Sequence, residues 1–341
     1  MSVKVLTSLR LNNAIHDILL GDKLAVLIGE DIKDPYGGAF KITKNLSKKF
    51  SNQIIQTPIS ESGFVGMATG MILKGMNPIV EIMFNDFLPL VSDIIINSST
   101  KIPELSKNKK KLGKLLIRTP GGGGRGYGPI HSQNLEKIFF GFPNLELASP
   151  NLLIDPYETL KNFYETESNV KIFLENKLDY AKKIITKDFL KDNELKTKDI
   201  SSKLKTKILS NSKDLDNPDI FMMCYGGLTE RAISAAKKLL IEDEIETSII
   251  VPSKIYPLDI ELNKYLSKIN KPIIIFEDNY TDNGWGSYIL NILSEVNNFL
   301  SFKDVKIIGP KKSIIPANVE KERKHFVDED KILEHSRNLL L

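Results

Sequence analysis

The chain has 341 residues, 41% of them hydrophobic and 26% charged, and its net charge of +4 is small against 47 basic and 43 acidic side chains. This length favours two domains, and so slight a charge excess gives little support for binding nucleic acid. The single cysteine, Cys224, excludes an intramolecular disulfide framework and a cysteine-rich zinc site, and its apolar neighbours predict a buried packing residue.

Short apolar segments that predict β-strands alternate with helical patterns in the first half of the chain. An amphipathic helix around His16 comes first. Strands are then expected at 24–28, 78–83, 115–117, 145–148 and 170–174. Helices are expected between them, at 42–50, 61–74, 87–99, 132–139 and 156–165. Such alternation predicts a mainly parallel sheet covered on both faces.

The composition changes between about 182 and 217, where Lys, Asp, Ser and Thr dominate. This predicts an exposed connection, part of which could pair as an edge strand. The alternation then restarts, with strands at 220–225, 246–251, 272–277 and 305–308 and helices at 229–241, 287–296 and 330–340. We therefore expect an α/β protein with two doubly wound domains, 1–185 and 218–341, joined by a polar linker at 186–217.

The segment 57–70 places Glu61 at the head of a predicted helix that contains Gly63, Gly66 and Gly70. Each glycine weakens a helix interior by roughly 1 kcal/mol relative to alanine, so this backbone is expected to lie close to another helix or to a flat ligand. Glu61 is either a first-turn residue that stabilises the helix dipole or a buried carboxylate for proton chemistry. The residues alone leave both interpretations open.

The glycine-rich loop 119–131 leaves the end of a predicted strand and ends at His131. Its spacing matches neither the dinucleotide fingerprint nor the P-loop, so we expect a mobile active-site loop whose glycines adopt positive φ. Ligand crevices of open α/β sheets lie at the ends of strands, which makes His131 a candidate functional residue. His16 and His335 fall on amphipathic helices, and His325 lies in a charged run and is expected to be solvated.

Four further residues lie near the ends of predicted strands. Glu30 and Glu81 have the same two interpretations as Glu61: a purely structural role or proton chemistry. Phe84 and Phe87 are most simply core residues, although an aromatic side chain at such a turn could stack on a planar ligand. The basic run 107–114 is expected to be a solvated loop.

No basic-then-apolar leader opens the sequence, and no apolar run approaches the ~20 residues that cross a bilayer. We therefore expect a protein of the cytoplasm, or of an organelle matrix, with no membrane partner and no nucleic acid.

Taken together, these segments resemble the beta subunit of the first component of 2-oxo acid dehydrogenase complexes, of the pyruvate or branched-chain type, within the transketolase-like superfamily. The most specific strings are Thr-Pro-Ile-Ser-Glu at 57–61 and Gly-Tyr-Gly-Pro-Ile-His-Ser-Gln at 126–133. Further matches follow in order over nearly the whole chain, at 29–31, 75–87, 118–120, 174–176, 225–227 and 257–259.

The resemblance implies a thiamine-diphosphate enzyme whose pyrimidine-binding domain and C-terminal transketolase-like domain lie on this chain. The diphosphate and its Mg²⁺ would be held by an alpha subunit through a Gly-Asp-Gly motif, which this sequence does not contain. The complete enzyme would be an α₂β₂ heterotetramer with active sites at subunit interfaces. It would oxidatively decarboxylate a 2-oxo acid and transfer the acyl group to a lipoyl group of an acyltransferase component.

The resemblance also implies roles for individual residues. Glu61 matches the glutamate that hydrogen-bonds a ring nitrogen of the aminopyrimidine, and Phe87 matches the aromatic residue that packs against that ring. Ile59 and Glu30 match residues near the ring. His131 matches the histidine that faces the substrate and the incoming lipoyl group. No metal ligand is implied for Mg²⁺ on this chain.

Two points stay open at this stage. A structural potassium ion is possible near 164–169, where some relatives hold one, although the match there is weak. The function has two alternatives, a split transketolase-like or acetoin-cleaving thiamine-diphosphate enzyme and a non-catalytic partner subunit of the same fold. The sequence does not select the 2-oxo acid.

Overall fold

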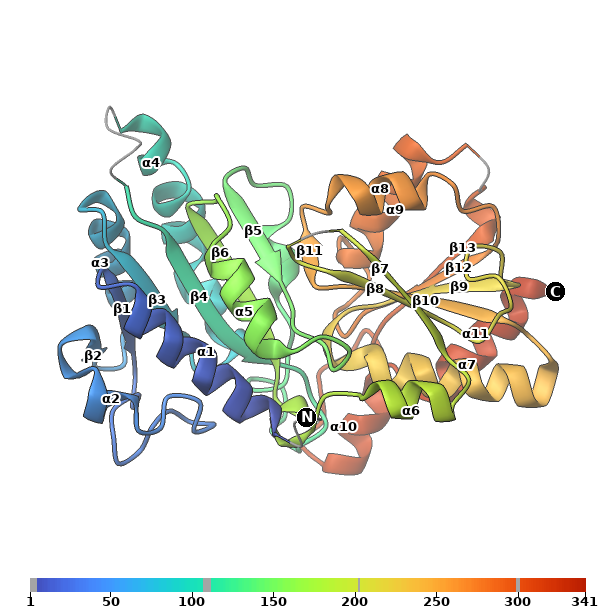
Figure 1. Ribbon diagram of the computed structural model, residues 1–341, viewed down its shortest axis with the longest axis horizontal. Coiled ribbons are helices and arrows are strands. Elements are labelled where there is room, and N and C mark those ends of the chain that lie inside the picture. Colours follow the sequence, from blue (N-terminus) through green and yellow to red (C-terminus); the bar gives the residue numbers. More distant parts are fainter. Residues whose placement is uncertain (1–4, 107–111, 202, 299–300) are drawn as a thin grey trace.

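The computed structural model describes residues 5–106, 112–201, 203–298 and 301–341, which form two α/β units side by side (Figure 1). Each unit is built around its own sheet, with helices on both faces, as the alternating pattern predicts. Within these ranges, no helix has both the length and the apolar character needed to cross a bilayer.

The first sheet has seven strands in the order β11-β5-β6-β4-β3-β1-β2. The parallel strands are β1 Ala25–Gly29, β2 Ile54–Gln56, β3 Asn77–Glu81, β4 Leu115–Gly121, β5 Leu145–Ala148 and β6 Val170–Asn176. Their residues alternate between two apolar layers: Leu27 and Ile79 pack on one face, and Ile28 and Val80 on the other. Because both faces are buried, successive positions are apolar, and the sequence predicts all of these strands except the three-residue β2.

Helices cover this sheet on both sides. The α-helices are α1 Thr7–Gly21, α2 Leu46–Lys49, α3 Glu61–Leu73, α4 Ile102–Leu105 and α5 Pro156–Tyr164. Shorter 3-10 helices span Ser51–Gln53, Asn85–Val91, Glu136–Phe139 and Asp179–Ala181, and a π-helix spans Ile94–Ser99. Apolar residues of α1 and α5 line one face of the sheet, and those of α3 line the other.

Three predicted α-helices differ from the structure. The segment 42–50 is α-helical only from Leu46 to Lys49. The segment 87–99 is a 3-10 helix followed by a π-helix, and Pro89 within the 3-10 part has no amide hydrogen to donate. The segment 132–139 is helical only from Glu136 to Phe139. The amide groups of Gln133 and Leu135 bind the side chains of Asp86 and Asn85 instead of helix carbonyls.

The second sheet has six strands in the order β13-β12-β9-β10-β8-β7. Its parallel part comprises β9 Ile220–Met223, β10 Thr247–Pro252, β12 Ile273–Phe276 and β13 Val305–Ile308. Its helices are α6 Lys187–Asp192, α7 Thr229–Asp243, α8 Ile260–Leu266, α9 Trp285–Val296, α10 Val319–His325 and α11 Glu329–Leu340, with 3-10 turns at Gly226–Leu228 and Phe302–Asp304. Cys224 follows β9 and is fully buried, as predicted.

The range 186–217, predicted as a polar linker, contains helix α6 and two strands of the second sheet, β7 Lys196–Ile200 and β8 Thr206–Ser210. Strand β8 pairs antiparallel with β10, and β7 pairs antiparallel with β8. Strand β7 is the exposed edge strand that part of this range was expected to form. Its lysine-rich sequence is typical of edge strands, which are kept charged to discourage further pairing.

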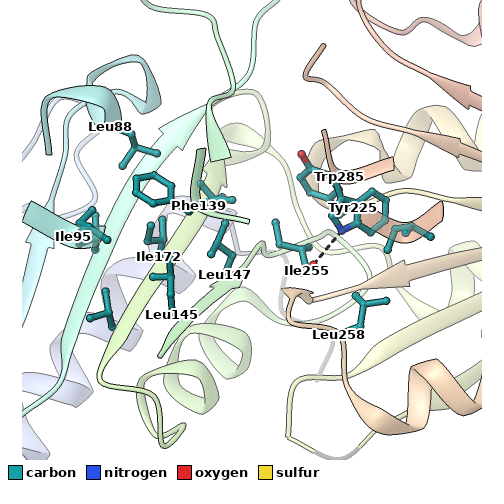
Figure 2. Packing of buried hydrophobic residues seen from close by; sticks show 14 of the residues in the cluster. Leu88, Ile95, Phe139, Leu145, Leu147, Ile172, Tyr225, Ile255, Leu258 and Trp285 are labelled. Atoms are coloured by element: carbon teal, nitrogen blue, oxygen red, sulfur yellow. Dashed lines mark hydrogen bonds between the residues drawn. The ribbon is translucent and has the colours of Figure 1, made fainter. Parts of the chain in front are cut away.

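The two units share one apolar cluster. Strand β11, Lys254–Tyr256, belongs to the second half of the chain but pairs antiparallel with β5 of the first sheet. Next to it, Phe139 and Ile172 of the first unit lie in the same cluster as Tyr225 and Trp285 of the second (Figure 2). Trp285 is fully buried, and its indole N–H donates to the carbonyl of Ile255 at 3.1 Å. The units therefore pack as one body.

Candidate functional site

The predicted site residues lie at the carboxyl ends of the parallel strands of the first sheet. In such sheets this edge forms the ligand-binding crevice. Five neighbouring segments meet there, namely Glu30 after β1, Glu61 after β2, Phe84 and Phe87 after β3, the glycine loop after β4 and Lys177 after β6.

Glu30 and Glu61 form a pair of closely placed carboxylates. Strands β1 and β2 are parallel neighbours, and the amide of Thr57 donates to the carbonyl of Gly29 at 3.0 Å, which brings the two strand ends together. Glu30 is 9% exposed and Glu61 is 8% exposed. Burial raises the pKa of the Glu30 carboxyl, and the charge of Glu61 raises it further, whereas the amide of Ser60 acts in the opposite direction.

Polar atoms at this position lack partners. Among the described residues, the Glu61 carboxylate has no hydrogen bond, although it is the first residue of α3. Glu30 Oε1 and Thr57 Oγ1 are buried and also have no partner within the described ranges. Buried polar groups are nearly always hydrogen-bonded in proteins, so these two buried atoms, with the unbonded Glu61 carboxylate beside them, indicate that a further binding partner completes the site. Ile59, by contrast, is 84% exposed.

The outer face of helix α3 is open. Apart from its own helix backbone and adjoining residues, a Cβ added at Gly70 would have no described atom within 4 Å, and one at Gly66 would meet the Ile94 side chain at 3.9 Å. Met67 and Leu73 on this face are 40% and 41% exposed. No described segment of this chain therefore packs closely against the backbone of α3 at Gly66 and Gly70. The expected close contact of this helix stays a prediction about a binding partner.

An aromatic cluster stands beside the open helix and contains the candidate histidine. The ring of Phe84 lies 4.6 Å from that of His131 and 5.8 Å from that of Phe87, both edge-on. Phe87 and His131 are 5.7 Å apart. The hydroxyl of Ser62 in α3 donates to the carbonyl of Leu90 at 2.6 Å, which ties the first turn of α3 to the 3-10 helix that carries Phe87.

The glycine loop is fixed by side chains of its own unit. Gly122, Gly124, Gly126 and Gly128 all have positive φ, between 73° and 101°, as predicted for a loop that requires glycine. The side chain of Asn134 accepts a hydrogen bond from the amide of Gly122 at 3.0 Å.

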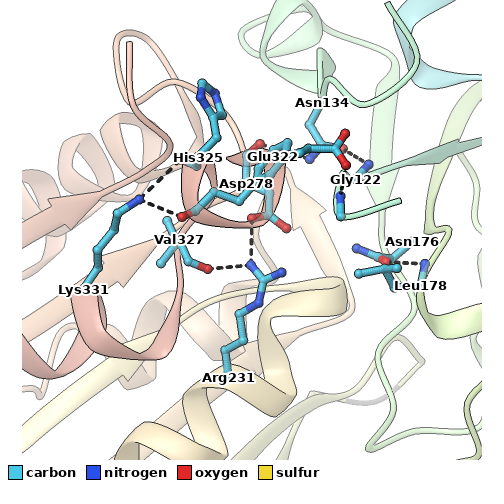
Figure 3. A network of polar contacts seen from close by, with 12 residues as sticks. Gly122, Asn134, Asn176, Leu178, Arg231, Asp278, Glu322, His325, Val327 and Lys331 are labelled. Carbon is cyan, nitrogen blue, oxygen red and sulfur yellow. Dashed lines mark hydrogen bonds and ion pairs between the residues drawn. The ribbon is translucent and has the colours of Figure 1, made fainter. Parts of the chain in front are cut away.

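The second unit also holds this loop. Glu322 of helix α10 is fully buried, and its Oε2 accepts hydrogen bonds from the amides of Gly124, at 3.0 Å, and Gly126. Arg323 donates to the carbonyl of Gly124 at 3.3 Å, and the ring of Phe326 lies against Gly123. Figure 3 shows Glu322 where the two units meet. The loop, expected to be mobile, is therefore bound on two sides by these contacts.

His325, expected to be solvated, is 3% exposed. Its ring contacts those of Phe326 and Tyr280, with centroids 5.4 and 6.3 Å away. The prediction of a solvated His325 is wrong because α10 is amphipathic. Glu322 and His325, three residues apart, lie on its buried face. Burial lowers the pKa of His325, and nearby lysines lower it further.

Lys177, which the sequence did not single out, lies directly beneath His131. It is 1% exposed, and its ammonium group donates to the carbonyl of His131 at 2.5 Å. It also lies over the rings of Phe84 and Tyr127, 5.2 and 6.0 Å from their centroids. Burial lowers the pKa of Lys177 to about 8, while the carboxylate of Asp86 acts in the opposite direction.

Glu81, the other candidate carboxylate, belongs to a fully paired network. Arg118 donates to Glu81 at 2.8 Å and to both oxygens of Glu175 at 2.7 and 2.8 Å. The hydroxyl of Tyr180 donates to Glu175 at 2.6 Å. This arrangement joins the ends of β3, β4 and β6 and indicates a structural role for Glu81.

Known proteins match this chain over nearly its whole length. Residues 4–183 match the family described as the transketolase pyrimidine binding domain, and residues 212–332 match the transketolase C-terminal domain. The chain is 30% identical to the mitochondrial pyruvate dehydrogenase E1 component subunit beta of Saccharomyces cerevisiae, over 94% of this chain and 84% of that one. It belongs to the family of 2-oxo acid dehydrogenase beta subunits.

Two further comparisons place this beta subunit among its relatives. The 2-oxoisovalerate dehydrogenase subunit beta of Bacillus subtilis is 29% identical over 96% of both chains. A solved structure described as split gene transketolase, inactive beta4 tetramer, has a TM-score of 0.73 and 16% identity over 98% of both chains. The latter likeness shows the fold alone.

The residues of this beta subunit fit the pyrimidine half of thiamine diphosphate. The two adjacent carboxylates, Glu30 and Glu61, and the hydroxyl of Thr57 offer unpaired polar atoms, and the rings of Phe84 and Phe87 stand nearby. A planar heterocycle with ring nitrogens and an amino group is the kind of ligand that such a set can bind. Within the described ranges, no group of three or more His, Cys, Asp or Glu side chains is arranged to hold a metal ion.

Two positioning residues escaped the sequence-based analysis. Lys177 follows β6 at the same sheet edge as the other candidates, and that position was a usable signal. Glu322 lies 198 residues after Gly124, which it binds, and no local sequence pattern marks it.

Proposed function

We propose that this chain is the beta subunit of a thiamine-diphosphate-dependent 2-oxo acid dehydrogenase. With an alpha subunit, it would oxidatively decarboxylate pyruvate or a branched-chain 2-oxo acid and pass the acyl group to a lipoyl group of an acyltransferase component. The observation that carries this proposal is the unpaired, buried carboxylate of Glu61 beside Glu30 at the open face of α3.

Glu61 is proposed to hydrogen-bond a ring nitrogen of the bound aminopyrimidine and to exchange a proton with it. Thiamine diphosphate, when bound, supplies the carbanion chemistry of decarboxylation. The protein places the carboxyl group for this exchange: Glu61 stands at the first turn of α3, and its negative charge raises the pKa of the neighbouring Glu30 carboxyl. Ile59 and Glu30 would lie beside the ring, as the resemblance implies.

Phe87 and His131 are proposed to form the substrate side of the site. Phe87 would pack against the pyrimidine, and His131 would face the 2-oxo acid and the lipoyl group. The edge-on contacts among Phe84, Phe87 and His131 support this proposal because they hold the imidazole in one orientation.

The open face of α3 supports assembly with an alpha subunit, proposed as an α₂β₂ heterotetramer. Gly66 and Gly70 allow the backbone of a partner to approach closely, and the exposed Met67 offers apolar surface. The partner would supply the diphosphate and Mg²⁺ ligands.

The test combines the chain with its alpha partner and measures decarboxylation of pyruvate, branched-chain 2-oxo acids and acetoin. We expect Glu61→Gln to lower the rate by roughly 10²–10⁴-fold, because it removes a proton-transfer group. Glu158 is the matched control, since it is an exposed glutamate in the first turn of α5. If Glu61 only stabilises a helix dipole, Glu61→Gln and Glu158→Gln will have equally small effects.

The same assay separates the alternatives. Cleavage of acetoin, or ketol transfer without acylation of a lipoyl domain, would favour a split transketolase-like enzyme. A complex that takes up no thiamine diphosphate in calorimetry would indicate a non-catalytic subunit.

A further inference from the structure

Two lysine side chains from outside the segment 164–169, near which the resemblance makes a structural potassium ion possible, bind main-chain oxygens of this segment. This segment leads from the C-terminal end of α5 into β6. Lys171 Nζ donates to the carbonyl of Tyr164 at 2.6 Å, and Lys114 Nζ donates to the carbonyl of Thr166 at 2.7 Å. Two main-chain oxygens in a short loop are thus already bound by cationic groups.

The carbonyl groups at the C-terminal end of α5 can accept hydrogen bonds from such donors. The last carbonyls of an α-helix have no partner within the helix, and the helix dipole places partial negative charge there. Potassium ions in proteins are commonly surrounded by backbone carbonyl oxygens. An ammonium group carries the same single charge and can donate to several such oxygens.

The position of Lys171 is unusual for a lysine. It lies in β6 between Val170 and Ile172, and it is 1% exposed. In a strand buried on both faces, such a side chain is costly unless its charge is paired. The carbonyl of Tyr164 accepts one of its hydrogen bonds, and Glu146 of β5 lies opposite it in the sheet register.

The charges around this position allow little room for a further cation. A second ammonium group, that of Lys114, already lies against the same loop, on the carbonyl of Thr166. Glu146 is itself engaged, accepting hydrogen bonds from Lys254 at 2.9 Å and from the hydroxyl of Thr166 at 2.6 Å. A potassium ion would therefore add a third positive charge beside two ammonium groups.

We propose that the amino group of Lys171 takes the place of the structural potassium ion in this chain. The loop 164–169 is then held between α5 and β6 by a covalently attached cation, and the fold of this beta subunit does not depend on potassium. This inference goes beyond the proposed function and is independent of catalytic activity.

The test measures the thermal unfolding midpoint of the full chain in KCl and in NaCl at equal ionic strength. The wild-type chain is expected to have the same midpoint in both salts. Lys171→Ser removes the amino group and opens its space, and potassium is expected to raise the midpoint of this variant by on the order of 5 °C over sodium. Lys171→Met is the matched control, because it removes the charge but keeps the space filled, and it should show no preference.

Either of two results would overturn the proposal. One is a potassium-specific rise of the midpoint in the wild-type chain, which would reveal an ion site beside Lys171. The other is a Lys171→Ser chain that folds and responds equally to both salts, which would mean that the position is not one for an alkali cation. Should that variant fail to fold, the wild-type comparison still decides.

Discussion

Lys177 offers the sharpest test of how the site is held, because its stability effect and its functional effect are expected to have opposite signs. Its amino group donates to the carbonyl of His131 and also lies over the rings of Phe84 and Tyr127. Lys177→Met keeps the length and the aromatic contacts but removes the charge and the donor.

The magnitude follows from the pKa of Lys177, which burial lowers from 10.5 to about 8. Below pH 8 both the folded and the unfolded chain hold the proton, and the folded chain bears the full cost of the buried charge, about 3 kcal/mol. Between pH 8 and 10.5 the unfolded chain binds more protons than the folded one, so the free energy of unfolding rises with pH. The cost is expected to fall by about 2 kcal/mol from about pH 7 to about pH 9.5.

At neutral pH the Met variant is therefore expected to be as stable as the wild-type chain or more stable, since the lost hydrogen bond contributes only about 1.5–3 kcal/mol. Urea unfolding at both pH values should show the wild-type chain gaining about 2 kcal/mol on the variant as the pH rises. Lys187→Met, at an exposed position of α6, is the control and should leave the difference independent of pH.

The catalytic activity of the Lys177→Met variant, unlike its stability at neutral pH, is expected to fall. If Lys177 positions His131, Lys177→Met lowers kcat of the assembled enzyme by on the order of tenfold or more, with a smaller change in KM, and Lys177→Arg restores part of it. A difference in stability that does not vary with pH would refute the buried charge. Full activity in the Met variant would refute the positioning role.

Three further substitutions test other parts of the site. Gly70→Ala should stabilise the isolated chain by up to about 1 kcal/mol in thermal unfolding. Gly70→Leu should weaken assembly with the alpha subunit, as measured by sedimentation. A loss of stability in Gly70→Ala would mean that this face of α3 is covered within the chain. Glu322→Ala should cost about 1–3 kcal/mol and speed tryptic cleavage at Arg125, because two loop amides lose their acceptor; unchanged cleavage would contradict the clamp. Glu30→Gln should gain stability over the wild-type chain as the pH rises above the unfolded value of 4.5, because the folded carboxyl releases its proton at a higher pH than the unfolded one; a difference without pH dependence would exclude the raised pKa.

The sheets were predictable from the sequence because buried parallel strands are continuous apolar runs. Strands β5 and β13 match their predicted bounds, and α3 and α5 match to within one residue. The misses have identifiable causes. Pro89 turns a predicted α-helix into a 3-10 segment, and strand β7 was expected only as an unplaced edge strand because its side chains face water and lack an apolar pattern.

The site was predictable only where a local pattern marks it. Position after a strand singled out His131, the glycine-containing helix singled out Glu61, and both lie at the carboxyl edge of the first sheet. Their chemical roles came from the family resemblance, since a first-turn glutamate alone is compatible with a helix-dipole role. Lys177 and Glu322 act through tertiary contacts that no local pattern encodes.

The features without a partner in this chain gather on one side of the first sheet. Glu61 lacks a hydrogen bond, Glu30 Oε1 is buried without one, Gly66 and Gly70 weaken α3 with no close contact in return, and Ile59 is 84% exposed, all judged against the described residues. Each is unfavourable in an isolated chain, because buried polar groups, helical glycines and exposed apolar side chains all reduce stability. Under the proposed function, the missing stabilisation would come from the alpha subunit and from the cofactor between the two subunits. Binding of either should then raise the unfolding temperature of the beta subunit, and the two increments should exceed the sum of their separate effects, because each completes the site that the other requires.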